Sequence, residues 1–250
     1  MNSITGHVAP GMVARITGGL YLAYIVASVL ATALGQIGLG AAPQVYQAIA
    51  TNEGSFRLGL VVALTTGFLF LMVAWGLYVL LRRVNRDLAL LFLLLNVVGV
   101  AIQGASMLSL VSAMLQGDGA SRMQAYSAAQ LEGLAYLSIN VYKMGFVTAQ
   151  LFFGTWLFPL GYLVYKSRVL PRFLGVLLVL DGVAVLIWFL QALLLPDYPA
   201  IHYPGLVVSF VAEVGLGLWL LVEGVKVVDA GAGLRKSRRD VAPQAERARS

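Results

Sequence analysis

The stretch LGLVVALTTGFLFLMVAWGLYVLL at residues 58–81 decides the fold class of this chain. Its 24 residues include no Asp, Glu, Lys, Arg or His. A helix needs about 20 predominantly apolar residues to cross the ~30 Å hydrocarbon core of a bilayer, so this stretch is long enough to span a membrane. Its apolar residues are continuous and do not alternate with polar ones, which favours a helix over a strand of a membrane β-barrel.

Five further stretches have a similar length and character, and short charged or proline-containing segments separate them. They lie at residues 16–35, 88–107, 146–165, 173–195 and 206–227. The whole chain of 250 residues is 60% hydrophobic and 11% charged, whereas soluble domains are about 45–50% apolar and about 25% charged. We therefore expect an all-α polytopic membrane protein, a bundle of six transmembrane helices. This composition excludes soluble enzymes, disordered chains and nucleic-acid-binding proteins.

The Lys and Arg residues are distributed unevenly among the segments that join these spans. Of the 17, 14 fall on the side that holds both termini, and only Arg57, Arg122 and Lys143 fall on the other. Because cytoplasmic loops carry an excess of Lys and Arg, we predict that both termini are cytoplasmic.

Three segments follow from this topology. Residues 1–14 form a cytoplasmic N-terminal segment, and residues 15–227 form the six-helix transmembrane domain. Residues 228–250 form a tail that is rich in Ala, Arg and Ser. With few apolar residues it is expected to be disordered, and its basic cluster is expected to contact anionic lipids at the cytoplasmic face of the bilayer.

The first span allows two interpretations. Arg15, the apolar run and the triplet Ala31-Thr32-Ala33 are compatible with a signal peptide that ends at a small-residue cleavage site. Small residues also recur at every fourth position of this span, namely Gly19, Ala23, Ala27, Ala31 and Gly35. Such a row lets membrane helices pack closely. We predict that the span is retained and that the row faces another helix.

Two of the segments on the side away from the termini contain helical signals. Between the first and second spans, Val45 and Ile49 predict a short interfacial helix. Between the third and fourth, Ser121 and Gln124 form a capping-box pattern, which predicts a helix that begins at Arg122. Continued to the end of the fourth span, that helix would reach about 66 Å at 1.5 Å per residue. We therefore expect it to break, at residue 133 or 145, both glycines.

Two carboxylates lie inside predicted spans, Asp181 in the fifth and Glu213 in the sixth. A carboxylate at mid-membrane costs about 2.5–3.5 kcal/mol even on insertion scales, so both are candidates for function. Counted from the cytoplasmic ends of the spans, Asp181 lies roughly 12 Å and Glu213 roughly 20 Å deep. Lys143 is too shallow to pair with either, so we expect at least one acid to be protonated.

Three amide side chains complete a predicted binding pocket with these acids. By the same count, Asn96 lies at the depth of Asp181, whereas Gln103 and Gln150 lie roughly 22–24 Å deep, near Glu213. This predicts two polar layers, Asn96 with Asp181 and Gln103 with Gln150 and Glu213. The alternative is that the amides only bond across helix pairs, for about 1 kcal/mol or less.

The sequence predicts no catalytic residue, no cofactor and no metal site. It contains no cysteine, and its two histidines, His7 and His202, lie outside the predicted spans. This excludes bis-histidine haem and a histidine metal cluster. Neither a Gly-x-Ser-x-Gly nucleophile elbow nor a Walker-type phosphate loop is present.

Several short motifs resemble those of a known family. They are RITGGLYL at residues 15–22, NRDLALL at 85–91, LFFG at 151–154, LGYLVYKS at 160–167 and LPRFLGVLL at 170–178. Over about residues 13–227 the chain resembles the bacterial domain-of-unknown-function family four-three-eight-six. The resemblance implies a six-helix bacterial membrane protein, and we accordingly expect it in the plasma (inner) membrane. It implies no activity and no site residues.

Three functions remain open at this point. The first, which we favour, is a multi-pass protein that binds or carries a small molecule, a lipid or a proton in the polar pocket, and it requires a cavity. The second is a non-catalytic scaffold or sensor subunit, which predicts a closed core. The third is an intramembrane enzyme with the two carboxylates as acid and base, which requires both at one cavity.

Overall fold

The computed structural model describes residues 10–117, 126–167 and 170–224. Its long helices are α1 (Pro10–Gly35), α3 (Glu53–Leu81), α4 (Arg86–Gly117), α5 (Ala128–Lys166), α6 (Arg172–Leu194) and α7 (Tyr203–Val222). All six are long and apolar enough to cross a membrane, and the described residues contain no strand. The chain is therefore a multi-pass α-helical membrane protein, which confirms the predicted fold class.

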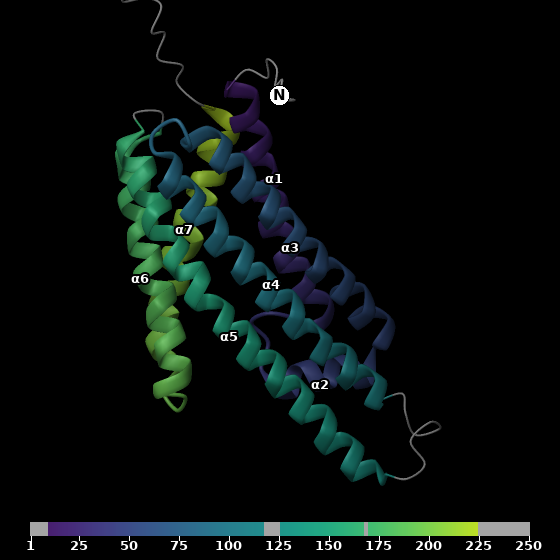
Figure 1. Ribbon diagram of the computed structural model, residues 1–250. Helices are drawn as coiled ribbons and strands as arrows, with labels where there is room; N and C mark the ends of the chain where they lie inside the picture. Colours follow the sequence, from purple (N-terminus) through teal and green to yellow (C-terminus); the bar gives the residue numbers. More distant parts are fainter. Residues whose placement is uncertain (1–9, 118–125, 168–169, 225–250) are drawn as a thin grey trace, which may run out of the picture.

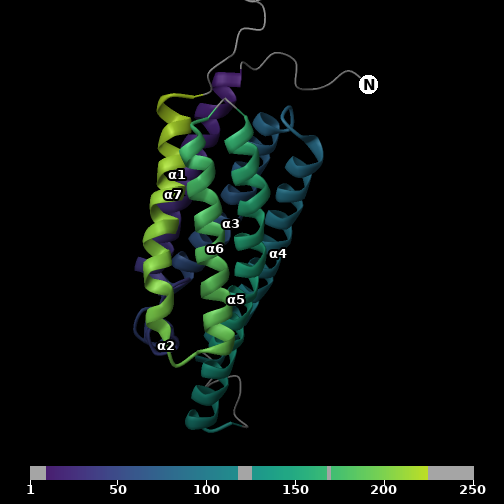
Figure 2. The same cartoon turned by 90° about the vertical axis from the view of Figure 1, so that its left-hand side faces the viewer.

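The six long helices form a closed ring in chain order. Each packs against the next along the chain, and α7 packs against α1 to close the ring. The start of α1 and the end of α7 lie at the same end of the bundle, here named the terminal end (Figure 1). The opposite end, here named the distal end, holds the short helix α2 and the connection between α6 and α7 (Figures 1 and 2).

Helix α2 (Ala42–Thr51) is the predicted short helix between the first two spans. Val45 and Ile49 are buried, as expected for the apolar side of a helix that lies against the bundle. It packs mainly against α5 and α3, and the ring of Tyr46 stacks on Tyr136 of α5 at a centroid distance of 4.7 Å. These contacts fix the distal end of the ring.

The predicted break in the fourth span is wrong, because α5 is one continuous helix of 39 residues. Its distal part extends past the connection between α6 and α7 (Figure 2). There α2 and α4 pack against it, so its length is not limited by the thickness of the membrane. A helical glycine costs only about 1 kcal/mol, which these contacts outweigh at Gly133 and Gly145.

Helix α5 begins at Ala128 with a capping box. The Ser127 hydroxyl accepts a hydrogen bond from the Gln130 backbone N–H (3.3 Å), and the Gln130 side chain accepts one from the Ser127 N–H (2.8 Å). The start predicted at Arg122 lies outside the described residues. The same capping pattern thus operates six residues later than the sequence suggested.

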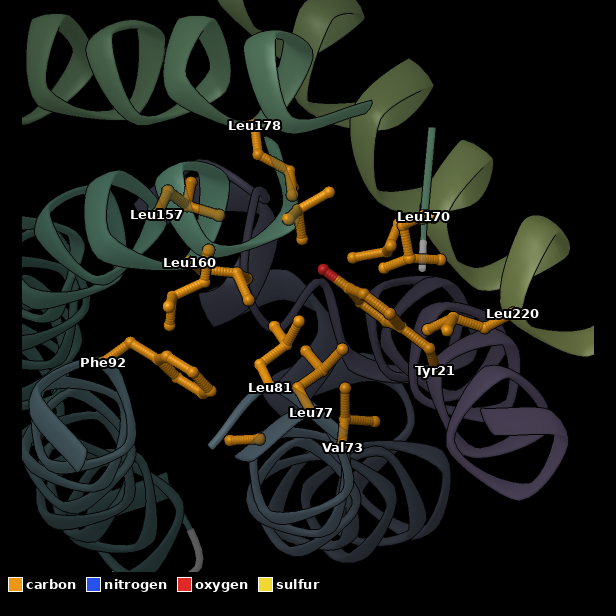
Figure 3. Close-up of a cluster of buried hydrophobic side chains, with 14 of the residues drawn as sticks. Tyr21, Val73, Leu77, Leu81, Phe92, Leu157, Leu160, Leu170, Leu178 and Leu220 are labelled. Atoms are coloured by element: carbon orange, nitrogen blue, oxygen red, sulfur yellow. The ribbon is translucent and has the colours of Figure 1, made fainter. Parts of the chain in front are cut away.

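A leucine-rich cluster fills the ring at its terminal end. This leucine plug consists of Leu77, Leu81, Leu160, Leu163, Leu174 and Leu220, all nearly or fully buried. Figure 3 shows four of them around the ring of Tyr21, whose hydroxyl points into the cluster. The plug comes from α3, α5, α6 and α7, so the centre of the ring is apolar and tightly filled at this end.

Helices α5 and α6 approach most closely along four glycines, here named the glycine seam. Gly154 and Gly161 on α5 are seven residues apart, as are Gly175 and Gly182 on α6. A Cβ added to Gly161 would lie 2.7 Å from the Gly175 carbonyl oxygen, and one added to Gly182 would lie 2.9 Å from that of Gly154. The two backbones are therefore in direct contact, as only small residues permit.

The predicted row of small residues on α1 is only partly a packing surface, because Ala23 is exposed. The buried residues of α1 are instead Ala14, Thr17, Gly18, Tyr21, Ala31 and Gly35. At Gly18 an added Cβ would lie 2.4 Å from the backbone nitrogen of Leu221 in α7. A spacing of four drifts about 40° per step around a helix with 3.6 residues per turn, so the row leaves the packed face.

We predict that the terminal end is cytoplasmic. A phosphatase that folds only outside the cytoplasm should be inactive when fused after Ser250 and active when fused after Leu195, at the distal end. We expect this because 14 of the Lys and Arg residues lie on the side of the termini and only three lie on the other side. Activity of the fusion after Ser250 would contradict it, and a green fluorescent protein fused at the same positions should give the opposite pattern.

Candidate functional site

A cavity of about 230 Å³ lies inside the ring, and all six long helices contribute to its lining. Its polar lining residues are Tyr24, Gln103, Gln150, His202, Ser209 and Glu213. Aromatic side chains provide much of the remaining lining, namely Phe70, Phe146, Phe153, Trp156 and Trp188. A mostly apolar lining with a few polar groups is typical of sites for small molecules.

A second cavity, of about 190 Å³, adjoins the first. Tyr24, Leu39, Gln103 and Phe146 line both. Leu39 is 59% exposed, so the cavities reach the surface at the distal end, at the connection between α1 and α2. Together they fall within the range of about 300–1,000 Å³ found for ligand pockets.

The structure brings three of the five predicted pocket residues to the first cavity. Gln103 comes from α4, Gln150 from α5 and Glu213 from α7. They are the residues that the depth count placed in one layer. Gln150 donates a hydrogen bond to the Phe146 carbonyl (3.2 Å), whereas no residue in the described ranges donates a hydrogen bond to the Glu213 carboxylate. Glu213 thus lines the cavity without a partner in the part of the chain that the structure describes.

Asp181 lies behind the cavity wall and does not line it. Its side chain is fully buried. The Ser209 hydroxyl donates a hydrogen bond to Oδ1 of Asp181, and Oδ2 has no partner among the described residues. Ser209 also lines the cavity one turn before Glu213 on α7. Asp181 therefore reaches the cavity only through Ser209.

The predicted layer of Asn96 with Asp181 is not formed. Asn96 is fully buried on α4, and neither atom of its amide has a hydrogen-bond partner within the described ranges. In the ring, α5 lies between α4 and α6. A count of rises along a helix gives depth but not the direction in which a side chain points, so two residues at one depth need not meet.

The aromatic part of the lining was not predicted from the sequence. Tyr24 stacks on Phe70 at 4.5 Å, and Phe70 meets Phe153 and Trp156 edge to face at 5.4 and 5.2 Å. These rings come from α1, α3 and α5, which pack around the same space. Inside continuous apolar runs an aromatic residue carries no periodic signal, so nothing in the sequence distinguished cavity-facing rings from lipid-facing ones.

His202 is a second lining residue that the sequence did not suggest. It ends the short 3₁₀ helix η2 (Pro199–His202), which folds back over the distal end of α6. The imidazole stacks on Trp188 at 5.4 Å, and its Nδ1 lies 3.1 Å from the Gln191 side-chain oxygen. His202 lies outside the predicted spans, which is why it was not considered for the pocket.

Two neighbouring residues of α5 hold the connection that borders the cavities. The Lys143 ammonium donates hydrogen bonds to the carbonyl oxygens of Gly38 (3.0 Å) and Gly40. The Tyr142 hydroxyl accepts one from the Gly38 N–H at 2.8 Å. Leu39 lies between these anchored positions. Lys143 is thus bound to this connection, and among the described residues no Lys or Arg lines either cavity.

The two predicted carboxylates are not presented to the cavity together. Of the two carboxylates only Glu213 is presented to the cavity, so the pair that an intramembrane acid–base enzyme requires is not formed there. The described residues also contain no group of three or more His, Cys, Asp or Glu side chains that could hold a metal ion.

Comparison with known proteins identifies one matching family model and one distant relative. The family model described as "Domain of unknown function (DUF4386)" matches residues 16–224. An uncharacterized protein of Archaeoglobus fulgidus is 29% identical over 160 residues, which cover 62% of this chain and 76% of that protein. No solved structure matches.

Proposed function

This chain belongs to the DUF4386 family, and we propose that it is a membrane-embedded protein that binds, or carries, a small organic molecule in the cavity of its helix ring. One observation carries the proposal: all six long helices line one cavity, in which Glu213, Gln103 and Gln150 face aromatic rings. Protein interiors are close-packed and leave few voids larger than a water molecule, so a cavity of this size is not a by-product of helix packing. A scaffold whose helices only pack together has no need of such a space.

The position of the cavity supports access from the distal end. Leu39 and His202 line the first cavity, and the connections to which they belong lie at the distal end (Figure 1). The leucine plug fills the ring on the terminal side. A molecule can therefore reach Glu213 from the distal end without disturbing the plug. Release on the other side would require the plug to rearrange, so the described conformation corresponds to a state with one open side.

We also infer where the protein lies in the cell. The distribution of Lys and Arg supports a position in the plasma membrane with the terminal end in the cytoplasm. The tail, residues 228–250, lies outside the described residues and would then be placed beside anionic lipids of the inner leaflet. In this orientation the cavity is reached from outside the cell.

We test the proposal with 1-aminoanthracene, an uncharged aromatic molecule whose fluorescence rises in apolar surroundings. The full chain, purified in an uncharged detergent, should bind it above the signal of protein-free micelles. Leu206 lines the cavity, and replacing it by Trp should weaken probe binding by about tenfold or more, because the larger ring occupies the space.

The neighbouring residue provides a matched control. Val207 is 65% exposed and faces away from the cavity, so Val207→Trp should leave probe binding unchanged. Equal binding by wild type, Leu206→Trp and Val207→Trp would show that the probe does not enter the cavity. Absence of binding above the micelle signal would contradict the proposed function and favour the scaffold.

A further inference from the structure

We propose that the ligand of this cavity is a small hydrophobic organic cation, an aromatic amine or a quaternary ammonium compound. The inference rests on the proposed function and narrows it to one class of ligand. It combines two properties of the lining that are independent of each other, an unpaired carboxylate and a surrounding of aromatic rings.

Within the described ranges, no Lys, Arg or His forms an ion pair with the carboxylate of Glu213, although His202 lines the same cavity. Among the described residues no Lys or Arg lines either cavity, and the Lys143 ammonium is bound to carbonyl oxygens of the α1–α2 connection. An ionised carboxylate in such surroundings is stabilised only by a nearby opposite charge or by hydrogen bonds. A cationic ligand would provide that charge.

The aromatic rings supply the second half of a cation site. On one side of the cavity, the ring of Phe70 contacts those of Tyr24 and Trp156. On another side, the rings of Phe146 and Trp188 contact each other at a centroid distance of 5.9 Å. Aromatic faces attract cations through their quadrupole, and cages of such rings recognise quaternary ammonium groups. They also bury the apolar part of the ligand.

The same lining disfavours the other classes of ligand. An anion would meet Glu213, with Asp181 behind Ser209 of the same lining, and like charges repel strongly where water is excluded. A neutral lipid or quinone would gain from the rings, but it would bring no positive charge to an ionised Glu213. A hydrophobic cation satisfies both parts of the lining.

The test compares a cation with its uncharged counterpart of the same shape. Benzyltrimethylammonium and neopentylbenzene differ in one atom, nitrogen against carbon, and hence in charge. Each would be titrated against 1-aminoanthracene bound to the full chain in uncharged detergent. We expect the cation to displace the probe from wild type at a concentration at least about tenfold lower than from Glu213→Gln. The glutamine keeps the shape of the side chain and removes its charge.

Three controls make the result decisive. Neopentylbenzene should displace the probe equally from wild type and Glu213→Gln. Glu223→Gln, the same change beyond the end of α7, should behave as wild type. If Glu213→Gln does not fold, as judged by loss of 1-aminoanthracene binding, Trp188→Leu takes its place. In that variant, the concentration of benzyltrimethylammonium that displaces the probe should rise about fivefold, and that of neopentylbenzene should change by less than about twofold.

The outcomes separate this inference from the function on which it rests. If the cation displaces the probe equally from wild type, Glu213→Gln and Trp188→Leu, the cation inference is overturned while the binding function stands. If the uncharged compound is the stronger competitor in wild type, the cavity is a site for neutral ligands. Failure of 1-aminoanthracene itself to bind would remove the proposed function.

Discussion

Replacing Gly161 by Ala is expected to destabilise the protein by about 3 kcal/mol, at the upper end of the range for overpacking. The added Cβ would lie 2.7 Å from the carbonyl oxygen of Gly175 and 2.8 Å from a methyl group of Val179. The carbonyl belongs to the backbone of α6 and cannot move without the helix. In a thermal unfolding experiment in detergent, this loss should lower the Tm by roughly 6–12 °C.

Helix α5 contains its own control for this change. Nothing lies within 4 Å of the position that a Cβ on Gly133 would take. Gly133→Ala should therefore leave the Tm unchanged or raise it slightly, since Ala favours a helix by up to about 1 kcal/mol. A Gly161→Ala variant that melts like Gly133→Ala would show that α5 and α6 do not touch through their backbones.

The glycine seam gives a physical role to three of the motifs that resemble the family. Gly154, Gly161 and Gly175 belong to the motifs that carried the family resemblance. Their spacing of seven places each pair on one face of its helix, so that two helices can meet glycine to glycine. The motifs and the small residues of the first span are visible in the sequence, but the seam emerges only when the glycine spacings of two helices are compared.

The spans themselves could be predicted because their signal is local. The length and apolar content of each run are enough to identify a membrane helix. The short helix α2 also followed from the spacing of Val45 and Ile49. The continuity of α5 did not, because it depends on contacts with α2 and α4 that are far away in the sequence. The same holds for α1, whose packed face is set by where α3 and α7 lie.

The candidate site was predictable in depth and not in direction. Counting rises grouped Gln103, Gln150 and Glu213, and the structure brings these three to one cavity. The same count grouped Asn96 with Asp181, but α5 lies between their helices. Direction around each helix depends on the packing of the whole ring. The direction of a side chain also decides whether an aromatic residue such as Trp188 lines the cavity, and the composition of the span does not reveal it.

Replacing Lys143 by Met is expected to speed the exchange of molecules with the cavity. The Lys143 ammonium bonds to two carbonyl oxygens of the α1–α2 connection, those of Gly38 and Gly40. Hydrogen bonds to a charged group contribute about 1.5–3 kcal/mol to stability. Their loss should raise the population of conformations in which this connection has moved away by about tenfold or more. Because Leu39 of that connection lines both cavities, the way to Glu213 opens with it.

The measurement is the rate at which 1-aminoanthracene binds to and leaves the full chain after rapid mixing. Lys143→Met should increase both rates by about tenfold and change the affinity much less, since neither Lys143 nor Met at this position lines the cavity. Tyr142→Phe, which removes the acceptor of the Gly38 N–H, should act in the same direction. Lys166→Met makes the same change at the other end of α5, where the ammonium lies over the ring of Tyr162. If it speeds exchange as much as Lys143→Met does, the effect comes from loss of charge in general, and the α1–α2 connection does not control access to the cavity.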